Sequence, residues 1–571
     1  MNTTDHPGAF HVIDAMASSG LRDVVISPGS RNAPLVIACE AHPRIRTTVA
    51  LDERSAAHIA MGMGLKNRIP AAVISTSGTA AINHGPAIAE AAYQCTPLIS
   101  ITADRPVASR GQGLGQTVLQ TKLFEAHALL ELEVDETKMA VDEMRSLASD
   151  AMRVAAKGPV HVNMPFAEPL YGVMEREWKE LEPTVGEVGS ASAAIPALLL
   201  DYLCVHDPRI LLIGGASSFD EKWFELAGNF PQKLAAFSDV FGHVRGEGIA
   251  GASDRLLSAF GGKMPEGLRP SCVVTIGLPP MSAAWRAEVA SWSVPHWHIG
   301  LEAKAWEMFG GEPQPWKISA THGLELLLDA LPSFSSYAAS WQVALDRISR
   351  AEEQAVEQLA RPWCDWTAFD QLSKKMKRFE SLHFANSTSA RYAQWFDWDA
   401  VRLHANRGVA GIDGCLSAAV GDALMHPDQK VGLITGDAAW LYDLNGLHVR
   451  PFPKNLQVVL INNGGGNIFR WIQGPEELGL LPEFFEAPFL QNSEATAQAG
   501  GLDYFCAESP ALLDDVFELW DNNPRPSLLE IRTDGELSAK FYHDLQKVLF
   551  EQMGSTERIQ EKYESNKMDL D

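Results

Sequence analysis

The feature that most constrains the fold of this 571-residue chain is a repeated unit of a short β-branched run, a Gly- or Ser-bearing turn and an Ala-rich helical stretch. Continuous apolar strands that alternate with helices are typical of parallel sheets covered by helices on both faces. The clearest examples begin at Asp23, Ala71, Pro97, Arg209, Cys272, Lys430 and Leu456. The sequence therefore predicts an α/β fold built of doubly wound domains with mainly parallel central sheets.

Two stretches interrupt this pattern and suggest domain boundaries. Residues 187–196 are small and polar, and residues 335–363 form a charged helical connector. They divide the chain into three α/β blocks at 1–185, 190–345 and 360–571, each long enough to bury its own core. The first and third blocks share one plan, in which a strand ends in a Gly turn and is followed by a helix and another strand. The charged residues from Ser555 onward predict a frayed helix or a tail.

Composition excludes several classes of function. The 47 Lys and Arg residues against 72 Asp and Glu residues give a net charge of −25, which argues against a nucleic-acid partner. No apolar run approaches the roughly 18 residues that span a bilayer, and the first residues lack the pattern of a signal peptide. Seven scattered cysteines without a CxxC pair indicate a reducing compartment. We therefore expect a cytoplasmic protein without a membrane span.

The strongest group of candidate site residues lies in the third block. Gly436 and Asp437 end one predicted strand, and Asn463 ends the next one, 26 residues after Asp437. That separation fits one helix and one strand, so both side chains should reach the same sheet edge, where parallel α/β sheets bind ligands. Asp and Asn oxygens suit Mg²⁺ that also binds phosphate oxygens. Glycines 464–466 would let the backbone approach a phosphate closely.

Other glycine-rich strings carry weaker signals. The string from Gly111 has the wrong spacing for a dinucleotide site, and the one from Leu212 lacks the third glycine. The chain has no GxxxxGK[ST] segment, so it is not a P-loop nucleotidase.

Residues 436–469 resemble the metal–diphosphate motif of thiamine-diphosphate-dependent enzymes, and residues 52–57 resemble the segment that carries their cofactor-activating glutamate. Within that superfamily, five segments resemble the menaquinone-pathway family of 2-succinyl-5-enolpyruvyl-6-hydroxy-3-cyclohexene-1-carboxylate synthases. They begin at Ile26, Ser75, Ser100, Ala405 and Gly436. The resemblance implies a pyrimidine-binding domain (1–185), a central domain (190–345) and a diphosphate-binding domain (360–571). It also implies self-association, with active sites shared between subunits.

The resemblance implies thiamine diphosphate and Mg²⁺ or Mn²⁺ as cofactors. Glu53 would hydrogen-bond the pyrimidine ring nitrogen and promote the tautomer that deprotonates the thiazolium carbon. Ile412 would hold the cofactor in its bent form, and Gly436 would belong to the cofactor-binding turn. The metal ligands would be Asp437, Asn463 and the Gly465 carbonyl. Ile468 and Phe469 would flank the thiazolium.

The implied substrates are 2-oxoglutarate and isochorismate, which both carry carboxylates. The reaction is decarboxylation of 2-oxoglutarate and addition of the succinyl carbanion equivalent to isochorismate. Arginine binds carboxylates through two parallel hydrogen bonds, and four arginines are expected at strand-end turns. The resemblance places Ser387 and Arg391 on the succinyl carboxylate and Arg407 at the reacting centre. It places Ser30, Arg31, Arg105 and Gln116 on isochorismate.

One departure from the family concerns the central block. Ala283 and Ala284 stand where the family has a Lys-Arg pair, and Arg286 is the nearest residue that could replace it. Two alternative functions stay open at this point. The first is another thiamine-diphosphate carboligase or 2-oxo acid decarboxylase, such as an acetolactate-synthase-like enzyme. The second is a non-catalytic cofactor-binding regulator, since a fold alone does not fix a function.

Overall fold

The structure is a computed structural model. It describes residues 2–568 except 66–67, 179–193, 218–221, 223–225, 227–229, 245–247, 252, 301–305, 400–401, 473 and 489–491. Most of the predicted small polar boundary at 187–196 therefore lies outside the described residues. No described helix is long and apolar enough to cross a membrane.

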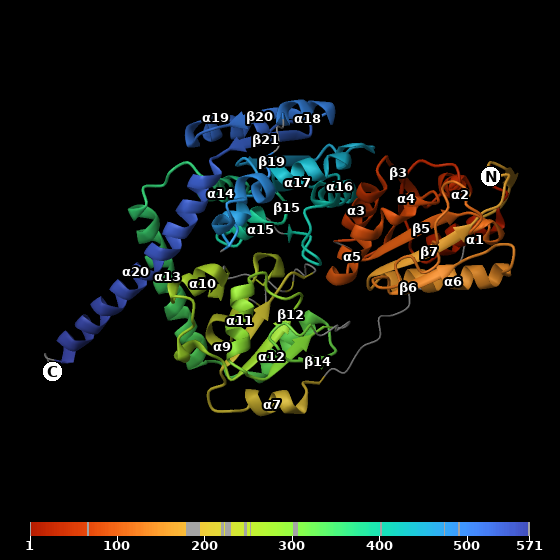
Figure 1. Ribbon diagram of the computed structural model, residues 1–571. Helices are drawn as coiled ribbons and strands as arrows, with labels where there is room; N and C mark the ends of the chain where they lie inside the picture. Colours follow the sequence, from red (N-terminus) through yellow and green to blue (C-terminus); the bar gives the residue numbers. More distant parts are fainter. Residues whose placement is uncertain are drawn as a thin grey trace.

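The chain folds into three large sheets, each flanked by helices (Figure 1). The first sheet has seven strands in the order β18-β3-β2-β4-β5-β7-β6, all parallel except β18, which pairs antiparallel with β3. Its strands are β2 Asp23–Ile26, β3 Arg46–Ala50, β4 Ala71–Ser75, β5 Leu98–Asp104, β6 Leu130–Glu133, β7 Pro159–Pro165 and β18 Val449–Arg450. A separate antiparallel pair joins β1 Asn2–Thr4 to β8 Val173–Glu175.

The second and third sheets have six parallel strands each. The second follows the order β11-β10-β9-β12-β13-β14, and the third β16-β15-β17-β19-β21-β20. The second contains β9 Ile210–Gly214, β10 Ala235–Ser238, β11 Ile249–Ala250, β12 Cys272–Ile276, β13 His296–Ile299 and β14 Gln314–Trp316. The third contains β15 Ser381–Phe384, β16 Arg402–His404, β17 Val431–Gly436, β19 Leu456–Asn462, β20 Asp503–Ala507 and β21 Ser527–Arg532. The prediction of mainly parallel, doubly wound sheets is confirmed.

Helices connect these strands. Those of the first block are α1 Pro7–Ser18, α2 Ala33–Ala41, α3 Glu53–Met63, α4 Thr79–Ile82, α5 Gly85–Gln94 and α6 Val141–Ala155. Those of the central block are α7 Ala197–Leu203, α9 Phe230–Lys233, α10 Ser253–Ala259, α11 Ala283–Ser291, α12 Ala320–Ala330 and α13 Ser336–Gln358. Those of the third are α14 Asp365–Lys375, α15 Thr388–Ala393, α16 Cys415–Met425, α17 Asp437–Tyr442, α18 Ser493–Ala499, α19 Pro510–Asp521 and α20 Gly535–Met568.

The long connector is helical, as its composition predicts. Helix α13 packs along α20, so the core of the central block continues into that of the third (Figure 1). The expected tail from Ser555 continues α20 as far as Met568. Each large sheet draws its strands from one block, apart from β18, which supports the proposed division at 1–185, 190–345 and 360–571.

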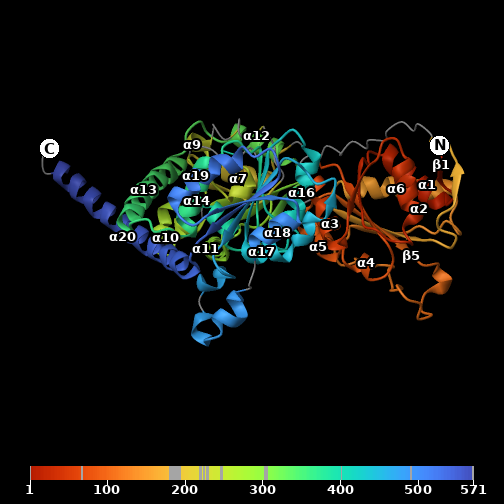
Figure 2. The same cartoon turned by 90° about the horizontal axis from the view of Figure 1, so that it is seen from above.

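The first and third blocks meet where α3 packs against α16, and both views show the two helices side by side (Figures 1 and 2). Two glycines make this close approach possible. A Cβ on Gly62 would lie 2.2 Å from the Ala418 carbonyl oxygen, and a Cβ on Gly421 would lie 2.1 Å from the Ile59 carbonyl oxygen. Side chains from both blocks form one buried apolar cluster around this contact. The two helix backbones therefore touch directly.

We expect Gly62→Ala to destabilise this junction, because its methyl group would meet backbone and not a movable side chain. Overpacking of this kind costs roughly 1–3 kcal/mol of unfolding free energy. Differential scanning calorimetry should show a lower Tm for Gly62→Ala. The matched control is Gly267→Ala, whose Cβ would have no neighbour within 4 Å. Equal Tm values for the two variants would contradict the packing described here.

Candidate active site

The predicted residues of the third block gather at the carboxyl ends of four neighbouring strands. In spatial order, these strands are β16, β15, β17 and β19. Arg407 and Ile412 follow β16, Ser387 and Arg391 follow β15, Gly436 and Asp437 end β17, and Asn463, Gly465, Ile468 and Phe469 follow β19. The expectation that Asp437 and Asn463 share a sheet edge is confirmed, because β17 and β19 pair in parallel.

Asp437 is the first residue of α17 and only 5% exposed. Its Oδ1 accepts a hydrogen bond from the Ala438 amide at 2.7 Å, and its Oδ2 accepts one from the Gly464 amide at 3.1 Å. Burial nevertheless raises the pKa of Asp437 to about 6, and the nearby Asp365 carboxylate adds to the rise. A divalent cation would favour the charged form. The chemistry at Asp437 therefore fits a metal ligand.

Asp365 orients the second predicted ligand, and sequence reasoning missed it. The Asn463 amide nitrogen Nδ2 donates to Asp365 Oδ2 at 2.7 Å, which leaves Asn463 Oδ1 as the atom that could bind a cation. The other Asp365 oxygen accepts a hydrogen bond from Thr533. Asp365 is fully buried, and burial raises its pKa. No motif marks this residue, since it lies 98 positions before Asn463.

The glycines beside these ligands leave room for a phosphate group. A Cβ on Gly436 or Gly464 would have no neighbour within 4 Å, so open space lies above both. Gly465 has a φ of +141°, and a Cβ there would lie 2.4 Å from the Glu486 carbonyl oxygen. Glycine is therefore required at 465 for conformation and for space. The turn fits a diphosphate with its cation.

Apolar side chains border the same edge. Ile412 packs against the small cluster of Ala385, Cys415 and Ala439. Phe469, in a short 3-10 turn after β19, packs against Phe485 with ring centroids 5.4 Å apart. The Ile412 and Phe469 positions are compatible with the cofactor contacts expected of them.

The two predicted site arginines of the third block, Arg407 and Arg391, differ in their surroundings. Arg407 donates from Nη1 to Asn386 Oδ1 at 2.7 Å. Burial lowers the pKa of Arg407, and the Arg391 and Arg286 guanidinium groups lower it further. Arg391 lies within helix α15 and not in the turn between β15 and that helix. The expectation that all four arginines lie in strand-end turns is therefore wrong for Arg391. Its Nη1 donates to the Ser387 carbonyl at 3.3 Å. The guanidinium groups of Arg407, Arg391 and Arg286 therefore lie close enough for their charges to interact.

The predicted residues of the first block follow the carboxyl ends of its own sheet. Arg31 donates to the Phe166 carbonyl and to Glu168, each at 3.2 Å. Arg105 donates to the Gly115 carbonyl at 2.9 Å, and the Ser30 hydroxyl lies 2.8 Å from that of Tyr171. Gln116, which is exposed, packs its backbone against Gly78. The structure brings these residues to one edge of the sheet, where Ser30, Arg31 and Arg105 form the hydrogen bonds above with other residues of the first block.

Glu53 begins α3 at the junction with the third block. The residues before and after Glu53 in the sequence both form hydrogen bonds with the third block. Asp52 accepts a hydrogen bond from Asn445 at 2.6 Å while it caps α3, and Arg54 donates to the Tyr442 carbonyl at 2.8 Å. The glutamate expected to activate the cofactor therefore lies where the first block contacts the end of α17 and the segment that follows it.

Glu90 of α5 makes a second contact across the junction that sequence reasoning missed. Its carboxylate oxygens accept hydrogen bonds from the Gly408 and Val409 amides at 2.6 and 2.8 Å. Glu90 is 1% exposed, and burial raises its pKa. An acidic residue in an Ala-rich, otherwise apolar helix was the signal that could have revealed it. Glu90 holds the loop that carries Arg407 and Ile412.

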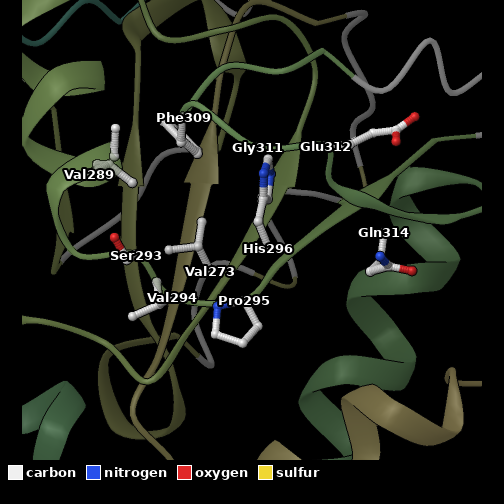
Figure 3. Close-up of a pocket in the computed structure, with 11 residues that line it drawn as sticks. Val273, Val289, Ser293, Val294, Pro295, His296, Phe309, Gly311, Glu312 and Gln314 are labelled. Atoms are coloured by element: carbon white, nitrogen blue, oxygen red, sulfur yellow. The ribbon is translucent and has the colours of Figure 1, made fainter.

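A cavity of about 230 Å³ lies elsewhere, in the central block (Figure 3). The cavity lies at the amino ends of β12, β13 and β14. Its lining includes the first residues of β13 and β14, which are His296 and Gln314, and the second residue of β12, which is Val273. Parallel α/β sheets bind ligands at the opposite edge. This cavity is therefore not part of the candidate active site.

A buried cluster in the third block resembles a metal site in composition. His383, His404 and Asp422 have potential ligand atoms within 4.8 Å of one another. Asp422 already accepts hydrogen bonds from Ser381 at 2.6 Å, and the Arg402 guanidinium lies 3.7 Å from it. Because this guanidinium balances the carboxylate, we interpret the cluster as an internal hydrogen-bond network.

Comparison with known proteins identifies the family. A family model described as "Thiamine pyrophosphate enzyme, N-terminal TPP binding domain" matches residues 7–127. The 2-succinyl-5-enolpyruvyl-6-hydroxy-3-cyclohexene-1-carboxylate synthase of Desulfotalea psychrophila is 32% identical over 532 residues, which cover 90% of this chain and 96% of the relative. The synthase of the same name from Cytophaga hutchinsonii is 31% identical over 558 residues, covering 95% and 98%. The chain belongs to this synthase family.

Family membership confirms the resemblance read from the sequence. The chain is a thiamine-diphosphate-dependent transferase of the menaquinone-biosynthesis type. In Flavobacterium johnsoniae, a synthase of the same name is 30% identical over 535 residues, 92% of this chain and 96% of the relative. The roles of individual residues stay predictions, which the geometry above supports.

We expect metal binding at Asp437 to depend on pH, because a cation binds the ionised carboxylate and the pKa is raised to about 6. In the presence of thiamine diphosphate, the affinity for Mg²⁺ should fall about tenfold per pH unit below pH 6 and level off above it. Titration of tryptophan fluorescence with Mg²⁺ between pH 5 and 8 measures this.

Asp437→Asn controls for protonation of the cofactor itself, since both proteins share that effect. The variant should bind Mg²⁺ weakly at every pH. A wild-type profile parallel to that of Asp437→Asn would contradict the assignment of this carboxylate as a ligand.

Proposed function

We propose that this enzyme decarboxylates 2-oxoglutarate and adds the succinyl carbanion equivalent to isochorismate. The products are 2-succinyl-5-enolpyruvyl-6-hydroxy-3-cyclohexene-1-carboxylate and CO₂, in menaquinone biosynthesis. The observation that carries the proposal is the similarity of nearly the whole chain to synthases of this name. The structure adds that Arg407 and Arg391 lie near each other beside the sheet edge proposed to bind the cofactor. Arg391 and Arg407 are half-buried, and partly desolvated guanidinium groups suit substrates that carry carboxylates better than uncharged ones.

Thiamine diphosphate, when bound, supplies the carbanion chemistry. In this proposal, Asp437, Asn463 Oδ1 and the Gly465 carbonyl hold Mg²⁺ or Mn²⁺, and the open space over Gly436 and Gly464 receives the diphosphate. Glu53 hydrogen-bonds the pyrimidine ring nitrogen. Apolar contacts come from the side chains that line the same edge, which are Ile412, Ile468 and Phe469.

The substrates would be held by arginines from two blocks. Ser387 and Arg391 bind the distal carboxylate of 2-oxoglutarate, and Arg407 acts at the reacting centre. Arg31 is 7% exposed, whereas the Glu168 side chain that it contacts is 73% exposed and could give way to a substrate carboxylate. On isochorismate, we place the set Ser30, Arg31, Arg105 and Gln116.

Self-association and a cytoplasmic location are further parts of the proposal. In the structure, α3 and α16 of one chain form the junction, and subunits that exchange this contact would share their active sites. Large apolar side chains stay exposed near both sheet edges, including Leu51 and Leu119 at 66% and 74% and Phe484 at 66%. A second subunit would cover such groups. The seven free cysteines are compatible with a reducing compartment.

The direct test is an assay of the purified protein with thiamine diphosphate, Mg²⁺, 2-oxoglutarate and isochorismate, with mass detection of the product. The expected product has the mass of isochorismate plus 2-oxoglutarate minus CO₂. Turnover of pyruvate without turnover of 2-oxoglutarate would overturn the proposal in favour of an acetolactate-synthase-like enzyme. Cofactor binding without any turnover would favour a regulator.

We expect Glu53→Gln to bind thiamine diphosphate with nearly wild-type affinity, because the metal and diphosphate contacts lie on the third block. Its carboligation rate should fall by roughly 10²–10⁴-fold, the usual contribution of a positioned acid–base group. Steady-state kinetics and a cofactor titration on the same sample separate the two effects. Wild-type turnover in this variant would show that Glu53 has no such role.

A further inference from the structure

The segment after β7, residues 166–172, extends along the carboxyl edge of the first sheet to the turn that follows β2. In the strand order, β4 and β5 separate β7 from β2. Arg31 of that turn nevertheless pairs with Glu168 at 3.2 Å. The Ser30 hydroxyl of the same turn lies 2.8 Å from the Tyr171 hydroxyl. Because parallel α/β sheets bind ligands at this edge, the segment lies where a substrate is expected.

Tyr171 is held at this edge by its neighbours in the sequence. On one side, Leu170 is 4% exposed and belongs to the core of the first block. On the other side, the Gly172 carbonyl accepts a hydrogen bond from the Asp5 amide at 3.1 Å. Both contacts fix the backbone, so the fold itself presents the Tyr171 side chain at the surface.

The Tyr171 side chain offers an aromatic ring to a ligand. Tyr171 is 67% exposed. A single exposed apolar side chain is common and needs no explanation. What distinguishes Tyr171 is that its hydroxyl is fixed on Ser30, so the ring is oriented before any ligand binds. An oriented aromatic ring can pack against the flat face of an unsaturated ring.

The two hydroxyl groups also offer a hydrogen-bond donor. One proton is used in the bond between Ser30 and Tyr171, and the other can be donated to a ligand. Both residues are exposed, so a ligand can reach them. Arg31 beside them adds a positive charge. A cation, a hydroxyl donor and an aromatic ring together match a ligand with a carboxylate, a hydroxyl and an unsaturated ring, which isochorismate has.

We propose that Tyr171 contacts isochorismate, with its ring against the unsaturated ring and the Ser30–Tyr171 hydroxyl pair as a donor to a substrate oxygen. Tyr171 is then a specificity-determining residue for the second substrate. The inference rests on the proposed function, because it takes Ser30 and Arg31 as contacts of isochorismate. It adds the segment after β7 to the substrate site.

The test compares Tyr171→Ala and Tyr171→Phe in the full-length holoenzyme. Alanine removes both the ring and the hydroxyl, so the KM for isochorismate should rise about 10–100-fold. Phenylalanine keeps the ring, so this KM should rise only about 2–5-fold. The KM for 2-oxoglutarate should change less than about twofold in both variants, because the residues that we place on that substrate lie in the third block.

Binding of isochorismate to the holoenzyme without 2-oxoglutarate, measured by calorimetry, is a readout that needs no turnover. Tyr171→Ala should bind isochorismate at least about tenfold more weakly than the wild type, with unchanged Tm and unchanged affinity for thiamine diphosphate. The matched control is Phe334→Ala, which removes a 64% exposed aromatic ring from the central block and should behave as the wild type.

A second subunit is the alternative occupant of this surface, since Val173 and Met174 are also exposed. Size-exclusion chromatography should show the same assembly for Tyr171→Ala and the wild type. Dissociation of Tyr171→Ala into smaller species, with wild-type affinity for isochorismate, would overturn the inference in favour of a subunit interface. A loss of affinity shared by Phe334→Ala, or an equal rise in both KM values, would overturn it as well.

The assay and the binding measurement together separate this inference from the proposed function. Product formation with an unchanged KM for isochorismate in Tyr171→Ala would overturn the inference and leave the proposed function standing. Absence of product, with isochorismate binding weakened by Tyr171→Ala as expected, would overturn the proposed function and leave the Tyr171 contact standing.

Discussion

Backbone contact between α3 and α16 is the constraint on which the candidate active site depends. Gly62 and Gly421 let the two helices touch, and this contact brings the first block, with Glu53 at the start of α3, to the third block, which carries the proposed metal and diphosphate site. Hydrogen bonds that the Asp52 and Glu90 carboxylates accept from the third block then fix the orientation of the two blocks. Each block folds its own sheet, but only their junction combines a possible acid–base group with a cofactor edge.

Buried charge is the second organising feature. The chain carries a net charge of −25, yet the half-buried Arg407 and Arg391 interact with each other at the proposed substrate site. Net charge describes the surface and solubility, whereas binding depends on local groups. The carboxylates of Asp437 and Glu90 are desolvated, and burial raises the pKa of both. Both carboxylates accept hydrogen bonds from two backbone amides. Glu90 thereby holds a loop of the third block, whereas for Asp437 we propose a bound cation as a further partner.

Sequence reasoning found the fold and the third-block edge because both depend on local patterns. Apolar runs with Gly turns define the strands, and the spacing of Asp437 and Asn463 reflects one helix and one strand. It missed Asp365 and Glu90, because these act through contacts across 98 and 318 residues that no local pattern encodes. It also placed Arg391 in a turn, since the start of a six-residue helix has little sequence signal.

The most direct test of this account is hydrogen–deuterium exchange at the thiazolium carbon of bound thiamine diphosphate, measured by rapid quench and NMR. If the α3–α16 junction brings Glu53 to the cofactor, exchange in the wild type should be at least about 10²-fold faster than in Glu53→Gln at equal cofactor saturation. Equal exchange rates in the two proteins would contradict the account.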